Sequence, residues 1–242
     1  MAKEEARSLD TLKRVRVGAG TMQVAVHQPQ TGCETKAIVI LMYPRSGMDG
    51  FPQRIAYELA SHGFATLVPD ITHRLPDEIT FRDRKRLLRD EEILEDVGAL
   101  LAQIEESDHG NLPRFVLGHC MGGRNALLAA SVYAFSGAVV FYGGEMFEAW
   151  GGVTSPFTRL VGIRCPVLGF FGGRDKNPSP TDVERIRQEL LRAEIVHHFT
   201  TYPEVGHAFQ QNADRSAEER SAADDSTAHM LEFFSKLSKI QH

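Results

Sequence analysis

The sequence predicts an α/β protein with a mostly parallel central sheet and helices on both faces of that sheet. From residue 37 onward, short apolar runs alternate with longer segments of helix-forming residues. The runs are apolar almost throughout, which is typical of parallel strands covered on both faces. A chain of 242 residues with 42% hydrophobic residues can bury a full core, and no Pro/Gly/Ser-rich linker divides it. We therefore expect a single domain over residues 1–242.

The expected elements follow in order along the chain. The stretches RVRV and MQVAVHQ alternate apolar and polar residues, so the first 36 residues are expected to add one or two strands. The later strands are predicted at 37–43, 65–70, 114–118, 137–143, 166–172 and 195–202. Helices are predicted at 51–62, 90–106, 122–133, 181–192 and 224–237. Because ligands bind beyond the carboxyl ends of the strands in such sheets, polar residues at those ends are the candidates for a site.

The charge balance gives no electrostatic case for binding nucleic acid. Lysine and arginine number 27 against 32 aspartates and glutamates, for a formal net charge of −5. One basic run, RDRKRLLRD at residues 82–90, is followed by two glutamates, and we interpret it as a solvated helix face. The expected partner is a small molecule.

The apolar runs and the cysteine spacing indicate where the protein is expected to work. The longest apolar run has about seven residues, far short of the roughly twenty that a membrane span needs, and the N-terminal stretch lacks the apolar core of a signal peptide. Cys33, Cys120 and Cys165 are widely spaced and match neither a disulfide framework nor a zinc-binding pattern. We therefore expect a cytoplasmic protein in a reducing setting, with no metal, cofactor or membrane partner.

A cysteine occupies a tight turn in the stretch GHCMGGRNALLAA. The apolar run RFVL precedes the turn and the helix formers NALLAA follow it, so the order is strand, sharp turn and helix. The turn reads Gly118-His119-Cys120-Met121-Gly122, which is the G-x-S-x-G nucleophile elbow with sulfur in place of oxygen. Its glycines leave room at a strained corner, and the helix N-terminus favours a thiolate or an oxyanion.

Two further candidates follow predicted strands in the same way. Asp175 lies in GFFGGRDKNPSP and His207 lies in TYPEVGHAF, each just after a strand. Nucleophile, acid and histidine in this order match the chain order of α/β-hydrolases. A thiol is mostly protonated at neutral pH, so a histidine must take its proton or pair with the thiolate. A carboxylate then fixes the imidazole tautomer and stabilises its charged form.

Each of these residues also has a plainer interpretation. A lone cysteine is often a small core residue, an aspartate after a strand often serves a turn, and a loop histidine is often merely exposed. The order of the three, each after a strand, favours the triad. His119 adjoins the nucleophile, but the turn directs it away from the thiol. We interpret Cys33 and Cys165 as structural or incidental.

On these residues the sequence resembles the dienelactone hydrolase family of α/β-hydrolases. The stretches that carry the resemblance are GHCMGG, FFGGRDKNPSP, EVGHAF, GFATLVPD and VVFYGG, and it extends from about residue 20 to the end. The resemblance implies an α/β-hydrolase fold in which Cys120 is the nucleophile, His207 the base and Asp175 the orienting acid. It also implies an oxyanion hole made by the backbone N–H groups of Met121 and Arg45.

One departure from the family pattern concerns the loop that supplies the second oxyanion donor. The family carries an acidic residue there, which helps to keep the thiol poised until substrate binds. Here the loop reads Tyr43-Pro44-Arg45-Ser46-Gly47, so that Pro44 takes the acidic position. Asp49 comes a few residues too late to be assumed a substitute.

A second departure concerns the substrate end of the pocket. In the best-known members an arginine four residues after the histidine binds the substrate carboxylate, and here that residue is Gln211. Arg82 or Arg84 corresponds to the family's second carboxylate-binding arginine. With Arg45, these residues are the candidate substrate contacts. The fold and the triad therefore transfer from the family, whereas dienelactone as the substrate does not.

The resulting hypothesis is a thiol hydrolase that acts on small esters or lactones through a covalent acyl-enzyme. The alternative is a non-catalytic or regulatory binding protein with the same fold, which the absence of the loop's acidic residue motivates. A redox-sensing thiol is a weaker third hypothesis, because no resolving cysteine is near in the sequence. The oligomeric state is left open.

Overall fold

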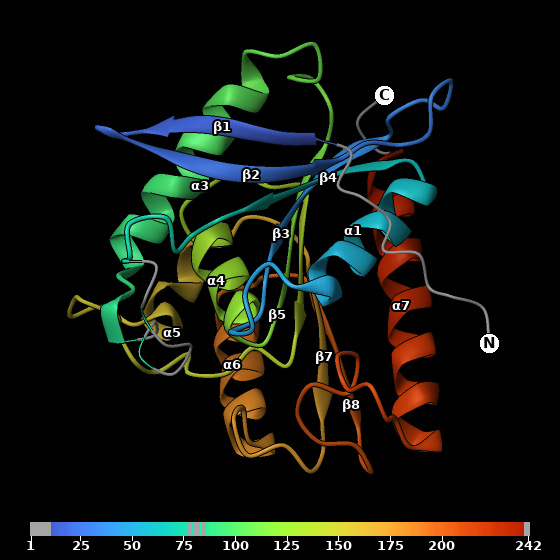
Figure 1. The fold of residues 1–242 in the computed structure, drawn as a ribbon. Helices are drawn as coiled ribbons and strands as arrows, with labels where there is room; N and C mark the ends of the chain where they lie inside the picture. Colours follow the sequence, from blue (N-terminus) through green and yellow to red (C-terminus); the bar gives the residue numbers. More distant parts are fainter. Residues whose placement is uncertain (1–10, 77–78, 80–82, 84–85, 240–242) are drawn as a thin grey trace.

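An eight-stranded sheet forms the centre of the computed structural model, which describes residues 11–76, 79, 83 and 86–239 (Figure 1). The strand order is β1-β2-β4-β3-β5-β6-β7-β8. The outer pairs β1–β2 and β2–β4 are antiparallel, and all other neighbours are parallel. The strands are β1 (Thr11–Val17), β2 (Gly20–His27), β3 (Ala37–Met42), β4 (Phe64–Pro69), β5 (Arg114–His119), β6 (Gly137–Phe141), β7 (Val167–Gly172) and β8 (His197–Tyr202).

Helices cover both faces of this sheet. Figure 1 shows α1 and α7 on one face and α3, α4 and α6 on the other. The helices are α1 (Gly50–Ser61), α3 (Asp90–Glu105), α4 (Met121–Ala130), α5 (Pro156–Arg159), α6 (Pro180–Arg192) and α7 (Ala217–Leu237), with a 3-10 turn at Leu160–Gly162. The predicted α/β class, with a mostly parallel sheet between two helical layers, is confirmed.

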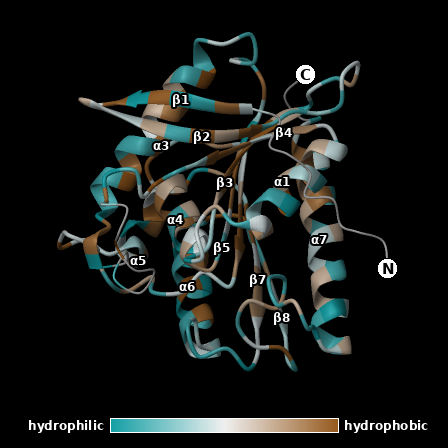
Figure 2. Cartoon of the chain, in the orientation of Figure 1, coloured by the Kyte–Doolittle hydropathy of each residue, from teal (hydrophilic) through white to brown (hydrophobic). Residues whose placement is uncertain are grey.

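The central strands are apolar throughout because both of their faces are buried. Every residue of β3, β6 and β7 is buried, so no polar residue alternates with the apolar ones. Figure 2 shows hydrophobic residues along the sheet and hydrophilic residues on the surrounding helices and loops. In the part of the chain that the structure describes, every helix is too short or too polar to cross a membrane.

The predicted elements are all present, with shifted ends. The largest shift is in α7, which begins at Ala217 rather than at residue 224. Ser216 caps this helix: its side chain accepts a hydrogen bond from the N–H of Glu219, and the Glu219 carboxylate accepts one from the N–H of Ser216. The Ser-x-x-Glu spacing of such a capping box is visible in the sequence. The short helix α5 and the 3-10 turn after it were not predicted.

The interpretation of residues 82–90 as a solvated helix face is wrong at its C-terminal end, where Asp90 is buried. Its carboxylate accepts two hydrogen bonds from the buried guanidinium of Arg124 on α4, at 2.6 Å and 3.1 Å, and one from the backbone N–H of Trp150 at 3.0 Å. The guanidinium lies 3.7 Å from the centre of the Trp150 ring. A buried arginine requires a partner of opposite charge, and here that pairing joins α4 to the start of α3.

Candidate active site

Cys120 lies at the sharp turn between β5 and α4, with a φ of 54° that residues other than glycine rarely adopt. Its backbone N–H donates to the carbonyl of Phe141 at 3.0 Å, which helps to hold this conformation. A side chain at Gly118 would collide with the carbonyl of Gly122, and a side chain at Gly122 would collide with that of Met42. Close packing of the backbone therefore requires both glycines of the elbow.

The side chains of Asp175, His207 and Cys120 form one continuous chain of contacts. Nδ1 of His207 lies 2.7 Å from Oδ2 of Asp175, and Nε2 of His207 lies 3.0 Å from Sγ of Cys120. The three residues follow β7, β8 and β5, and the parallel arrangement of these strands brings their carboxyl ends to one edge of the sheet. The Asp175 carboxylate is buried, whereas the His207 side chain is about one-third exposed, at 35%.

These contacts set the protonation of the pair. Burial opposes ionisation of the Cys120 thiol, but the hydrogen bond and positive charge of His207 outweigh it, so the pKa of Cys120 falls below the ordinary value of 9.0. Burial likewise opposes protonation of His207, yet its contacts with Asp175 and Cys120 raise the imidazole pKa above 6.5. Both shifts favour a thiolate beside an imidazolium, which is the reactive form of a cysteine nucleophile.

The backbone N–H groups of Met121 and Arg45 also help to lower the pKa of Cys120, because they favour the negative thiolate. Met121 is the first residue of α4, and Arg45 lies in the turn after β3, where the N–H of Gly47 donates to the carbonyl of Pro44 at 2.9 Å. The two N–H groups thus belong to separate elements that both act on the Cys120 thiol. Paired donors in this position can stabilise the negative oxygen that forms when a carbonyl is attacked.

Two other carboxylates that follow strands have different partners. Asp49 caps α1, where its side chain accepts a hydrogen bond from the N–H of Phe51 at 3.0 Å. Asp70 accepts hydrogen bonds from the Tyr43 hydroxyl at 3.1 Å and from the Thr72 hydroxyl at 2.6 Å. Asp49 and Asp70 therefore stabilise local structure, and Asp175 is the carboxylate that contacts His207.

The candidate substrate contacts are tied to neighbouring loops. Arg45 Nη2 donates to Glu145 Oε1 at 3.2 Å, and Gln211 Nε2 donates to the Ser46 hydroxyl at 3.0 Å. The loop that carries the second backbone donor is thus held from two sides. Arg82 and Arg84 lie outside the residues that the structure describes.

Sequence reasoning missed two residues at this edge, Glu145 and Asn177. Glu145 follows β6, so the rule that selected the triad, polar residues just after parallel strands, also selects it. The side chain of Asn177 accepts a hydrogen bond from the N–H of Glu145 at 3.0 Å, and the Asn177 N–H donates to Asp175 Oδ1 at 2.9 Å. Asn177 thereby links the loop of Asp175 to the loop of Glu145.

His119 is buried beside the elbow and serves the core. Its ring stacks on Phe141 with the centroids 4.5 Å apart, and its Nε2 lies 2.9 Å from Oε1 of Gln210. Burial lowers the pKa of His119 to about 3, so the ring is neutral near neutral pH. The amide of Gln210 in turn donates to Ser226 and Thr227 of α7. Gln210 was also missed, and no sequence signal marks it.

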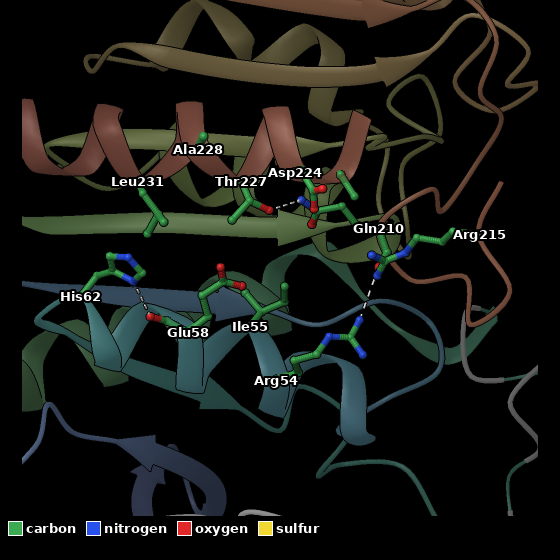
Figure 3. A pocket seen from close by; sticks show the side chains of 11 residues that line it. Arg54, Ile55, Glu58, His62, Gln210, Arg215, Asp224, Thr227, Ala228 and Leu231 are labelled. Atoms are coloured by element: carbon green, nitrogen blue, oxygen red, sulfur yellow. Dashed lines mark hydrogen bonds between the residues drawn. The ribbon is translucent and has the colours of Figure 1, made fainter. Parts of the chain in front are cut away.

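A polar cavity of about 340 Å³ lies between α1 and α7, and Gln210 is one of the residues that line it (Figure 3). Figure 3 shows Arg54 and Arg215 pointing toward Gln210, whose backbone carbonyl accepts hydrogen bonds from both guanidinium groups. Glu58 and Asp224 also line this cavity, so both signs of charge are present. Within the described residues, no three side chains among His, Cys, Asp and Glu gather as a metal site would require.

The sheet topology, the elbow after β5 and the loops at the carboxyl edge define an α/β-hydrolase. The family model for the dienelactone hydrolase family matches residues 22–238, and the chain belongs to this family of hydrolases. A relative from Escherichia coli (strain K12), named "Putative carboxymethylenebutenolidase", is 30% identical over 210 residues, which cover 81% of this chain and 76% of the relative. The "Carboxymethylenebutenolidase" of Rhodococcus opacus is 26% identical over 208 residues, covering 82% of this chain and 80% of the relative.

Solved structures agree on the fold. The crystal structure titled "Putative Dienelactone Hydrolase" from Klebsiella pneumoniae superposes with a TM-score of 0.84 at 22% identity. The superposition covers 93% of this chain and 97% of the other.

Proposed function

We propose that this chain hydrolyses small carboxylic esters or lactones through a covalent thioester on Cys120. The observation that carries the proposal is the contact series from Asp175 through His207 to Cys120. The backbone N–H groups of Met121 and Arg45 support it, because they favour the Cys120 thiolate. Membership of the family and the names of the relatives above, carboxymethylenebutenolidases, support a lactone as one class of substrate.

In the first half-reaction, the Cys120 thiolate attacks the carbonyl carbon and a carbon–sulfur bond forms. The carbonyl oxygen becomes negative and accepts hydrogen bonds from the N–H groups of Met121 and Arg45, each worth about 3 kcal/mol in the transition state. When the intermediate collapses, the ester carbon–oxygen bond breaks and the His207 imidazolium gives its proton to the leaving oxygen. In a lactone, the resulting hydroxyl stays attached to the acyl chain.

In the second half-reaction, the neutral imidazole of His207 removes a proton from water, and the water oxygen attacks the thioester carbon. The carbon–sulfur bond then breaks, the acid leaves, and the thiolate–imidazolium pair is restored. Asp175 keeps the imidazole oriented through both steps. Because a thiolate leaves more readily than an amine, attack on an amide would mostly revert. Activated esters and enol lactones are therefore favoured over peptides.

The test is Cys120-dependent turnover of short para-nitrophenyl esters and of a panel of lactones by the purified protein. Replacing Cys120 by alanine should lower kcat by about a thousandfold or more. The melting temperature should change by no more than about 2 °C, because little core packing is lost. Rapid quenching followed by mass spectrometry should find the acyl group on the Cys120 peptide of the unmodified enzyme.

A matched control is Cys33→Ala, which removes an exposed thiol and should leave turnover unchanged. Equal turnover by the Cys120→Ala variant would contradict the mechanism. No turnover of any ester or lactone would instead favour the binding protein that the absence of the loop's acidic residue suggested.

A further inference from the structure

We propose that Glu145 is a specificity-determining residue, whose carboxylate neutralises Arg45 beside the nucleophile and directs the enzyme to uncharged substrates. This inference rests on the proposed function and deepens it by naming the substrate class. Arg45 is the cation of the loop after β3, and its guanidinium is held by Glu145. Asn177 joins Glu145 to Asp175, the carboxylate that contacts His207, so the ion pair lies beside the candidate active site. What the Arg45 side chain binds therefore sets the charge at this edge of the site.

The contact is a partly buried ion pair rather than a surface one. Arg45 Nη2 lies 3.2 Å from Glu145 Oε1, with side-chain exposures of 33% and 15%. Reduced exposure to solvent weakens the screening by water and salt that makes most surface pairs ineffective. The positive charge of Arg45 is thus balanced within the protein before any substrate arrives.

The backbone of Glu145 is held so that its carboxylate stays at this position. The residue has a φ of 55°, in the left-handed region. Its N–H donates to the Asn177 side chain at 3.0 Å, and its carbonyl accepts a hydrogen bond from Nε of the buried Arg124 at 3.2 Å. These contacts on both sides of one strained residue fix where its side chain leaves the backbone.

An anionic substrate would meet an unfavourable charge at this place. A substrate carboxylate near Arg45 would also lie near the Glu145 carboxylate, and like charges at short range repel. Gln211, on the other side of the loop, donates to Ser46 and brings no positive charge. An uncharged acyl chain is not repelled by Glu145 and needs no positively charged partner.

Arg45 is nevertheless able to bind an anion if Glu145 is neutralised. Its Nε–H is buried and has no hydrogen-bond partner among the described residues, so the guanidinium has a donor to spare. Glu145→Gln removes the negative charge but keeps the side-chain shape and both backbone contacts. This variant therefore converts a charge-balanced site into one with a net positive charge.

The first experiment compares two esters with the same leaving group, para-nitrophenyl hexanoate and para-nitrophenyl hydrogen adipate. They differ only at the end of the acyl chain, which is a methyl group in the hexanoate and a carboxylate in the adipate. In Glu145→Gln, the ratio of kcat/KM for the anionic ester to that for the neutral ester should rise about three- to tenfold at low salt. Adding Arg45→Gln should abolish the rise, because that change removes the guanidinium and keeps the backbone N–H. Glu232→Gln, which removes a distant exposed carboxylate on α7, should leave the ratio unchanged.

The second experiment does not depend on turnover. Iodoacetate is an anion and iodoacetamide is neutral, and both alkylate the same sulfur. The rate of Cys120 alkylation by iodoacetate, divided by the rate with iodoacetamide, should rise at least about threefold in Glu145→Gln. An unchanged ratio in this experiment or in the ester comparison would overturn the inference. So would an equal loss of activity with both esters, since Glu145 would then only hold the loop. If wild-type turnover proves independent of Cys120, the proposed function fails, and the alkylation ratios still decide the role of Glu145.

Discussion

Nε2 of His207 lies 3.0 Å from Sγ of Cys120, and this contact distinguishes Cys120 from the other two thiols. It lowers the pKa of Cys120, whereas burial raises the pKa of Cys165 to about 11. Cys33 is exposed, with no such partner described for its sulfur. The thiolate is the species that reacts with alkylating agents, so the contact predicts selective chemistry at Cys120.

Brief treatment with iodoacetamide at about pH 6.5 should therefore modify Cys120 first, and peptide mapping by mass spectrometry would show it. His207→Ala removes the cation that stabilises the thiolate, so labelling of Cys120 at this pH should slow by about tenfold or more. Faster labelling of Cys33 or Cys165 in the unmodified protein would contradict the prediction.

Asp175→Asn should lower kcat by about a hundredfold or more, because an amide cannot stabilise the imidazolium or select its tautomer as a carboxylate does. Steady-state assays with a para-nitrophenyl ester measure this. The matched control is Asp70→Asn, which changes a carboxylate that also follows a strand but binds Tyr43 and Thr72. Its kcat should stay within a few-fold of the unmodified enzyme. A larger loss in Asp70→Asn than in Asp175→Asn would show that the acid is misassigned.

The fold and the three central side chains could be predicted because both depend on local patterns. A run such as Ala37–Met42 is apolar because both faces of the strand are covered, and that pattern is visible without the partner strands. Cys120, Asp175 and His207 each follow such a run, and the parallel sheet brings the ends of the runs together. The residues need not be close in sequence for this rule to work.

The polar partnerships around the triad could not be predicted in this way. Arg124 and Asp90 are 34 residues apart, and His119 and Gln210 are 91 apart. A charged or amide side chain carries no local mark of which distant group will satisfy it once buried. Glu145 satisfies the same strand-end rule as the triad, but a glutamate after a strand has many other uses, and its pairing with Arg45 depends on the tertiary structure.

Arg124→Met should destabilise the protein by about 3–5 kcal/mol, because it leaves the Asp90 carboxylate buried without its positive partner. Urea unfolding followed by circular dichroism measures the change. Arg187→Met is the control: Arg187 pairs with Glu184 on the exposed face of α6, and its loss should leave the free energy of unfolding nearly unchanged.

Removing both buried charges gives a second test of the Arg124–Asp90 pairing. Arg124→Met combined with Asp90→Leu should be more stable than Arg124→Met alone, since no uncompensated charge then remains. Equal destabilisation by Arg124→Met and Arg187→Met would contradict the importance of the buried pair.

The buried, neutral ring of His119 should make the protein less stable in acid. Its folded-state pKa is about 3 against an ordinary value of 6.5, so between these values the unfolded chain binds a proton at His119 that the native protein does not. The free energy of unfolding must then decrease as the pH falls below about 6.5, by up to about 1.4 kcal/mol per pH unit from this residue.

In His119→Phe the aromatic contact with Phe141 is kept and the titrating group is lost. The variant should be less stable near neutral pH by about 1–3 kcal/mol, because Oε1 of Gln210 loses its partner, but its stability should fall less steeply between about pH 6.5 and pH 5. Urea unfolding at a series of pH values measures both effects. His198→Gln, at an exposed position on β8, should leave the slope unchanged. Parallel curves for His119→Phe and the unmodified protein would show that His119 is protonated in the native state or does not titrate on unfolding.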